Sequence, residues 1–298
     1  MSTTMTSPRI ECVHRAGAQL GETPVWDSRL GVLWWIDIER PTLWQLDPAT
    51  GRTRGLAQPG TYLGSLALTR SRRHLVARDL DLLFLDPETG EAEPFATTPD
   101  ETMPDTRLND GRVDAQGRLW IGTMDNGLSE GKGGLYRVDP DGRMTRMFGD
   151  VIVSNGIAFD PDGRHMYFTD TRRYITYRLT LDASGEVVTD REVFADYSAT
   201  GTRPDGACID ADGCLWQAFF GGGKVVRYAP DGRIDREIAL PVTNPTCLCF
   251  GGSDLRTLYV TSANKFLSPD QLAAEPLAGA VLAIDGVGQG VPEQLFDA

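Results

Sequence analysis

Four segments of the chain share a spacing between two polar residues that could do chemistry. In each segment an oxygen-bearing side chain stands five residues before an aspartate. The four pairs are Glu22 and Asp27, Asn109 and Asp114, Asn155 and Asp160, and Asp205 and Asp210. The leading residues are two carboxylates and two amides, a set of oxygen ligands that suits a hard divalent cation. Crowded carboxylates also repel one another unless they are protonated or hold a cation.

A structural interpretation competes with the metal site at each of these positions. Asn and Asp side chains often bond to the local backbone in turns, so one such residue would not predict a site. Four residues in the same register favour a cation, with Ca²⁺ as the first candidate and Mg²⁺, Mn²⁺, Zn²⁺ or Fe²⁺ as alternatives. The matching positions in the two remaining copies of the pattern are Gly64 and Pro245, which add no side-chain ligand.

A longer repeat must position these residues. A tight turn followed by an apolar strand occurs six times, with spacings of 42, 44, 46, 50 and 43 residues between the copies. The anchor residues of the six turns are Gly31, Arg73, Gly117, Gly163, Gly213 and Arg256. After each copy comes a strand that ends in a second turn, as in LLFLDPETG. Helical periodicity is confined to a short stretch near SPDQLAAEPL. The pattern predicts an all-β fold, a six-bladed β-propeller of four-stranded antiparallel blades.

The propeller also has to close. Residues 10–14 are expected to pair as the outermost strand of the last blade, which removes an open sheet edge. The tail LAIDG…EQLF is expected to supply inner-to-middle strands of that blade. We expect one domain over residues 1–298, with residues 1–8 as a disordered tail. Equivalent positions of the inner strands form a ring around the channel, so the four polar residues should converge at one end of it. A two-sheet sandwich is the alternative that the six repeats argue against.

Composition excludes several classes of function. The chain has 298 residues with 29 Lys+Arg against 42 Asp+Glu, a formal charge of −13, which argues against binding to nucleic acid or to a membrane surface. Five cysteines without a CxxC pair favour a reducing compartment, and the absence of an apolar leader favours the cytoplasm. His74 and His165 are expected at the surface, and no histidine pair has zinc spacing.

Several motifs resemble those of the regucalcin–gluconolactonase family. They are GETPVWD, RLNDGRVDAQGRLWIGTM, SNGIAFDPDG, RPDGACIDADGCLW and CFGG. The resemblance implies a six-bladed propeller that binds one divalent cation and hydrolyses sugar lactones. It implies Glu22, Asn155 and Asp205 as metal ligands. It also implies that Arg107 and Asn109 contact the substrate, with Asn109 reaching the metal through water.

One position departs from that family. Where some members carry an acidic substrate contact, this chain has Gly127 in GTMDNG, so Asp125 or Asn126 is the expected substitute and we assign Asn126 to the substrate. Asp205 is the predicted catalytic base as well as a ligand, and a sugar lactone is the predicted partner. Arg172 is the loop residue expected to affect specificity. The alternatives are a non-catalytic Ca²⁺-binding regulatory protein and a broader ester or phosphotriester hydrolase. The sequence leaves the sugar, the metal and the oligomeric state open.

Overall fold

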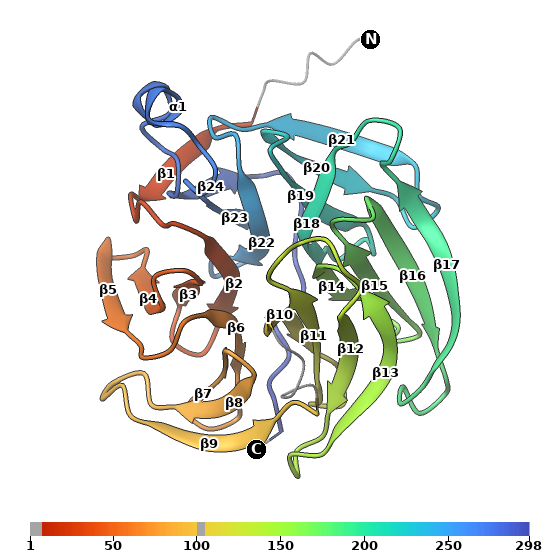
Figure 1. The fold of residues 1–298 in the computed structure, drawn as a ribbon. Helices are drawn as coiled ribbons and strands as arrows, with labels where there is room; N and C mark the ends of the chain where they lie inside the picture. The colour runs from red at the N-terminus through yellow and green to blue at the C-terminus, as the bar shows by residue number, and fades with distance from the viewer. Residues whose placement is uncertain (1–7, 100–104, 298) are drawn as a thin grey trace.

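Six antiparallel sheets stand around a common axis, each with four strands (Figure 1). The structure is a computed structural model that describes residues 8–99 and 105–297. Five sheets follow the chain order from the centre outward, and the last has the order β22-β23-β24-β1 counted from the channel. The predicted six-bladed propeller is therefore confirmed.

The strands fall into four layers from the channel to the outer surface. The innermost strands are β2 (Gly21–Asp27), β6 (Leu63–Leu68), β10 (Thr106–Val113), β14 (Ser154–Phe159), β18 (Arg203–Ile209) and β22 (Pro245–Gly251). The second strands are β3 (Val32–Asp37), β7 (His74–Arg78), β11 (Leu119–Asp125), β15 (His165–Asp170), β19 (Leu215–Phe220) and β23 (Thr257–Ser262). The third strands are β4 (Thr42–Asp47), β8 (Asp81–Leu85), β12 (Gly133–Val138), β16 (Ile175–Leu181), β20 (Lys224–Tyr228) and β24 (Val281–Asp285). The outermost strands are β5 (Arg52–Ala57), β9 (Ala92–Thr97), β13 (Met144–Val151), β17 (Val188–Asp196), β21 (Ile234–Ala239) and β1 (Ile10–His14).

The hydrophobic core lies between neighbouring blades. Strands β2 and β3 are buried along their whole length, since each face of an inner strand meets another blade. One core cluster joins Val25 and Trp34 of the first blade to Leu66 and Val76 of the second. The outermost strands carry polar side chains and are largely exposed, as in β17. Wide, continuous burial of the inner strands fixes their position and holds the residues that line the channel.

The ring closes through the N-terminal strand. Strand β1 pairs with β24 in an antiparallel register that joins Ile10 to Ile284, so this prediction is confirmed. The disordered tail was predicted over residues 1–8. Residues 1–7 of it lie outside the described residues.

The C-terminal segment departs from its predicted course. Residues 281–285 form the third strand of the last blade, but residues 293–296 are not strands of that blade. The segment crosses instead to the second blade, where the Phe296 N–H donates to the Leu68 carbonyl at 2.8 Å (Figure 1). The physical reason is that β22, β23 and β1 already fill the other three positions of the blade, and that the Phe296 ring is fully buried in the cluster that contains Leu75.

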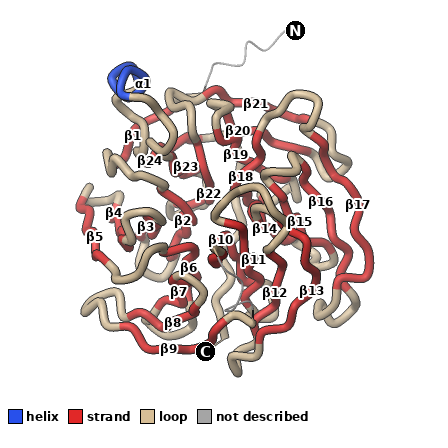
Figure 2. Tube along the Cα trace, viewed as in Figure 1, coloured by secondary structure: helices blue, strands red, loops and turns tan. Residues whose placement is uncertain are grey.

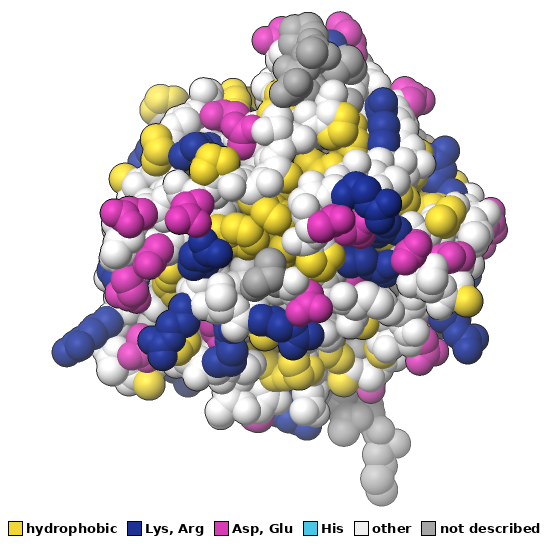
Figure 3. All heavy atoms as spheres, turned by 90° about the horizontal axis from the view of Figure 1, so that it is seen from below, with side chains coloured by type: hydrophobic (Ala, Val, Ile, Leu, Met, Phe, Trp, Pro, Cys, Tyr) yellow, Lys and Arg dark blue, Asp and Glu magenta, His cyan; other side chains and the backbone are white. Residues whose placement is uncertain are grey.

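Helix is almost absent from the described chain, as the single blue segment in Figure 2 shows. The helix α1 (Pro269–Ala274) begins at Ser268, whose side chain and that of Gln271 form a reciprocal capping box. No helix among the described residues is long and apolar enough to cross a membrane. The face of the molecule in Figure 3 carries cationic and anionic side chains interspersed, with small apolar areas between them.

Candidate active site

The predicted site residues lie where the inner strands depart from regular pairing. Each of the four strands has a register shift at or beside its site residue. The shifts fall between Glu22 and Val25, between Leu108 and Gly111, between Asn155 and Ala158, and between Pro204 and Ala207. A bulge bends its strand and re-aims the side chain that it contains. The bulges therefore explain how polar residues of inner strands face the channel while their neighbours remain in the sheet.

Local backbone constraints hold two of these bulges. Gly156 has φ +60°, and a Cβ there would lie 2.5 Å from the Thr169 hydroxyl oxygen. Thr23 has φ 45°, an uncommon conformation for a β-branched residue, and its N–H donates to the Glu22 carboxylate at 2.9 Å. Such strained positions persist where the surrounding structure fixes them, and they concentrate at functional sites.

One cavity of about 90 Å³ collects the predicted residues at the end where the inner strands begin. The structure brings together in its lining Glu22, Arg107, Asn109, Asn155 and Asp205. Apolar side chains complete the wall, among them those of Leu20, Ile38, Met124 and Phe220.

The two amides form a fixed network. Asn109 Nδ2 donates to the Asn155 side-chain oxygen at 2.8 Å and to the Ser154 carbonyl at 2.7 Å. Asn155 Nδ2 donates to the Thr171 hydroxyl at 2.8 Å, which orients the amide. One guanidinium nitrogen of Arg107 donates to the Asn109 side-chain oxygen. The Asn155 oxygen thus accepts one hydrogen bond and keeps a second lone pair for a ligand.

The two carboxylates are buried without a cation. Glu22 and Asp205 are each 6% exposed, and within the described residues neither has a Lys or Arg nitrogen within 4.0 Å. Burial raises the pKa of Glu22 to about 8, and the charge of Asp110 adds to the rise. Burial also raises the pKa of Asp205 well above its usual value, with the charge of Glu22 contributing. Both groups are costly to ionise unless a positive charge joins them.

The donor set fits a hard divalent cation. Within the described residues no group of three or more His, Cys, Asp or Glu is placed to hold a metal, so a cation here needs amide oxygen as well. Glu22 and Asp205 supply charge, and Asn155 supplies an oriented neutral oxygen. Oxygen ligands of this kind suit Ca²⁺ or Mg²⁺ better than the nitrogen- and sulfur-preferring transition metals.

Neither Asp125 nor Asn126 is among the residues that line this cavity. The Asn126 N–H donates to the Asp105 carbonyl at 2.7 Å, and the wall at this point is made by Met124 and Leu128. Asp125 is committed to its own loop. Its burial would raise its pKa, but hydrogen bonds from the N–H groups of Ser129, Glu130 and Gly127 and from Lys132 lower that pKa to about 2. Asn126 as a substrate contact therefore stays a prediction without a position to support it.

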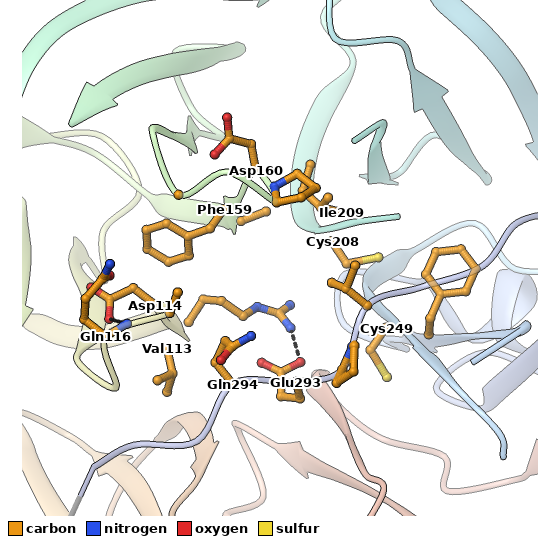
Figure 4. Close-up of a pocket in the computed structure, with 18 of the residues that line it drawn as sticks. Val113, Asp114, Gln116, Phe159, Asp160, Cys208, Ile209, Cys249, Glu293 and Gln294 are labelled. Atoms are coloured by element: carbon orange, nitrogen blue, oxygen red, sulfur yellow. Dashed lines mark hydrogen bonds and ion pairs between the residues drawn. The ribbon is translucent and has the colours of Figure 1, made fainter. Parts of the chain in front are cut away.

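A second cavity of about 280 Å³ lies where the inner strands end (Figure 4). The labelled Glu293 and Gln294 of the C-terminal segment border it opposite Phe159 and Asp160. Here the charges are paired, because Arg112 forms an ion pair with Glu293 at 2.8 Å. Although this cavity is larger, the half-buried Glu293 that borders it already has a cation, so we place the candidate active site in the smaller one.

Some residues lie elsewhere than the sequence predicted. His74 was expected at the surface but is 2% exposed, and its ring meets the Trp34 ring edge-on at 4.5 Å. His74 is the first residue of β7, a second strand that a neighbouring blade covers. The arginines that precede it in the sequence suggested an exposed segment, and the sequence does not show the covering blade. The pocket lining also includes Arg203 and Lys265, which the sequence analysis missed. Neither shares the five-residue offset, so the repeat gave no signal for them.

Comparison with known proteins gives consistent results. The profile of the SMP-30/gluconolactonase/LRE-like region matches residues 20–264. A 6-deoxy-6-sulfogluconolactonase of Pseudomonas putida is 42% identical over 288 residues, which cover 96% of this chain and 98% of that protein. Regucalcin of Xenopus laevis is 32% identical over 299 residues, covering 98% and 99% of the two chains.

A solved structure shares the same architecture. It is described as a calcium-binding protein, regucalcin, from Agrobacterium tumefaciens strain C58, and it superposes with a TM-score of 0.93 at 34% identity. The match covers 98% of both chains.

Proposed function

Because this chain belongs to the SMP-30/gluconolactonase/LRE-like family, we propose that it hydrolyses sugar lactones to aldonic acids with the help of one divalent cation. The broader assignment rests on its relatives, since the 42% identical protein is named for a lactonase activity. A lactonase is a hydrolase that opens a cyclic ester. The dependence on a cation and the roles of single residues are our inference from the site.

One observation carries the proposal. Two carboxylates, Glu22 and Asp205, are buried in the same cavity without a cationic partner, next to an oriented amide oxygen of Asn155. A folded protein that maintained this arrangement for stability alone would leave both acids with raised pKa values, because Arg107 and the N–H groups of Thr23 and Gly206 offset the burial only in part. A bound divalent cation supplies the missing charge.

We assign separate roles in the reaction to Asp205 and Arg107. A divalent cation, when bound, polarises a lactone carbonyl as a Lewis acid. We assign to Asp205 the role of accepting the proton of the attacking water, because this buried acid lines the cavity. Arg107 is buried beside Asn109, so its remaining N–H donors can hold sugar hydroxyls or the carboxylate that ring opening releases.

The direct test is proton release from a panel of aldono-γ- and δ-lactones. The protein is first treated with a chelator, and then Ca²⁺, Mg²⁺, Mn²⁺ or Zn²⁺ is added back. We expect activity to disappear on chelation and to return with at least one of these ions. Full activity in the chelated protein would contradict a cation-dependent mechanism.

The same panel separates the rival functions. The solved relative described as calcium-binding raises the possibility of a binding protein without turnover. That function predicts cation binding by calorimetry but no hydrolysis of any lactone. A broader esterase would hydrolyse aryl esters or phosphotriesters at rates comparable to those of lactones.

A further inference from the structure

The mouth of the candidate active site is basic, although the chain as a whole is acidic. The described residues that line the cavity include only two carboxylates, those of Glu22 and Asp205, but four cations. The cations are Arg107, Arg172, Arg203 and Lys265. Since the chain has 29 Lys+Arg against 42 Asp+Glu, a cavity richer in cations than in acids runs against its composition.

These cations lie at two depths. Arg107 is 5% exposed and hydrogen-bonds to Asn109, which in turn contacts Asn155. The side chains of Arg172, Arg203 and Lys265 are only half-buried, at the solvent end of the same lining. A lactone whose carbonyl lies by the acid pair therefore extends its remote end toward the outer three cations.

The two outer arginines are held by neutral groups. Arg172 Nε donates to the Leu128 carbonyl at 3.0 Å. The Arg203 guanidinium lies 5.5 Å from the centre of the Phe220 ring. Among the described residues neither has a carboxylate within 4.0 Å. Both guanidinium groups thus keep donors available for a ligand.

Other cations close to these two arginines do have carboxylate partners. Arg173 follows Arg172 directly, yet it forms ion pairs with Asp150 at 2.7 Å and Asp170 at 3.0 Å. Lys265 pairs with Glu39. The outer arginines are therefore the part of this surface whose charge is left uncompensated.

The charge balance of the occupied site indicates what it would accept. A divalent cation neutralises Glu22 and Asp205, which leaves four cationic side chains and Glu39, or 4 − 1 = +3 in formal charge. Uncharged sugar hydroxyls do not require such an excess. An anionic group would be attracted to it, and a planar arginine fork matches the oxygens of a carboxylate, phosphate or sulfonate.

We propose that the preferred lactone carries an anionic substituent at the end of the sugar remote from the lactone carbonyl, and that Arg203, with Arg172 and Lys265, binds it. This inference rests on the proposed lactonase function and names its substrate class. The shared chemistry is a group of two or three charged oxygens. Separate arms of the test distinguish carboxylate, phosphate and sulfonate.

The kinetic test compares four substrates: glucono-δ-lactone, its 6-phospho and 6-deoxy-6-sulfo derivatives, and a glucarolactone. In the wild type, kcat/KM should be highest for one of the three anionic lactones and should fall as salt is added. Arg203→Gln should lower the ratio of anionic to neutral kcat/KM by on the order of tenfold to a hundredfold, the usual worth of a charge-assisted hydrogen bond. Arg203→Lys should restore part of the ratio, because lysine keeps the charge but not the fork.

Arg191 offers a matched control. Its guanidinium also lies over aromatic rings, 5.0 Å from the centre of Tyr177, but on the outer strand β17 and outside the cavity lining. Arg191→Gln should leave the ratio unchanged. An equal loss in Arg191→Gln and Arg203→Gln would show a general effect of net charge and would overturn the proposal.

A binding measurement gives a readout independent of turnover. Gluconate and 6-phosphogluconate are titrated calorimetrically into wild type and Arg203→Gln, with and without chelator. Arg203→Gln should weaken 6-phosphogluconate more than gluconate. If both weaken equally, the basic mouth serves the carboxylate formed by ring opening, and the proposal is wrong. Hydrolysis of all four lactones with similar kcat/KM refutes the anionic subsite alone, whereas hydrolysis of none with any metal refutes the lactonase function.

Discussion

The two ends of the inner strands hold buried acids in different surroundings. Where the strands end, Asp210 is 1% exposed, accepts the indole N–H of Trp216 at 2.8 Å, and forms an ion pair with Arg227 at 2.7 Å. Asp114 repeats the pattern with Arg118 at 2.8 Å. These carboxylates each carry their own cation.

Where the strands begin, the acids of the cavity lack such partners. Glu22 and Asp205 are nearly as buried as Asp210, at 6% exposed each, but have no Lys or Arg nitrogen within 4.0 Å among the described residues. Asp205 lies near the start of strand β18, and Asp210 comes directly after its end. Burial alone therefore does not separate a structural acid from a functional one.

The difference lies in what satisfies the charge. An acid that is paired inside the fold contributes to stability, and removing it leaves a buried cation unpaired. An acid that is buried without a partner costs stability until something binds. The two ends should consequently respond in opposite ways to the same substitution.

The largest expected effect is on catalysis by Asp205→Asn. If Asp205 is base as well as ligand, kcat should fall by on the order of a hundredfold or more, the usual contribution of general-base catalysis, and saturating metal should not restore it. Steady-state kinetics across a metal titration measures this. Full recovery at high metal would show that Asp205 is only a ligand.

Asp210→Asn is the matched substitution at the other end of the strand. It should lower the free energy of unfolding by about 1–3 kcal/mol, because the buried carboxylate beside Arg227 loses its charge, although Arg227 keeps Asp212 and Asp235 as partners. Urea unfolding measures the change, and kcat below the unfolding transition should stay close to that of wild type. A loss of kcat without a loss of stability would contradict the division between the two ends.

The sequence predicted the blades because the fold repeats. Six copies of a turn and strand at near-constant spacing determine the layers, and the five-residue offset placed Glu22, Asn155 and Asp205 at the same end of their strands. The offset joins one residue at the start of each strand to one at its end. It could not show which end leaves its acids unpaired, since a partner such as Arg227 comes from another strand of the blade.

The remaining features depend on contacts between distant segments. The bulges at the site arise from close approach between blades, as at Gly206, where a Cβ would lie 2.4 Å from the Cys247 sulfur. The course of residues 293–296 depends on a buried gap for Phe296 in another blade. Arg203 and Lys265 meet in space from different blades, and no local pattern joins them.

His74 makes a third prediction, at the end of the molecule with paired acids. Burial lowers its pKa from 6.5 to about 4. The unfolded chain therefore takes up a proton below pH 6.5 that the folded chain refuses until about pH 4, so stability is present above pH 6.5 and is lost as the pH falls toward 4. The loss from this residue is roughly 3 kcal/mol across that interval. Urea unfolding of wild type and His74→Phe between pH 7 and pH 4 measures it, and an equal acid slope in both would contradict a neutral buried imidazole.

A gain of stability is expected from one substitution at the unpaired end, measured in chelator. Since burial raises the pKa of Glu22 from 4.5 to about 8, the unfolded chain releases this proton at lower pH than the folded chain. The free energy of unfolding of the metal-free wild type therefore falls as the pH rises from 4.5 to 8. Glu22→Gln cannot ionise and should escape this loss, which makes it more stable than wild type at pH 8 by roughly 3 to 5 kcal/mol, with little difference near pH 4.5. Added Ca²⁺ should reverse the order, because only the wild type binds it tightly. If chelated Glu22→Gln is instead less stable at pH 8, Glu22 has a stabilising partner and the two ends of the channel do not differ as described.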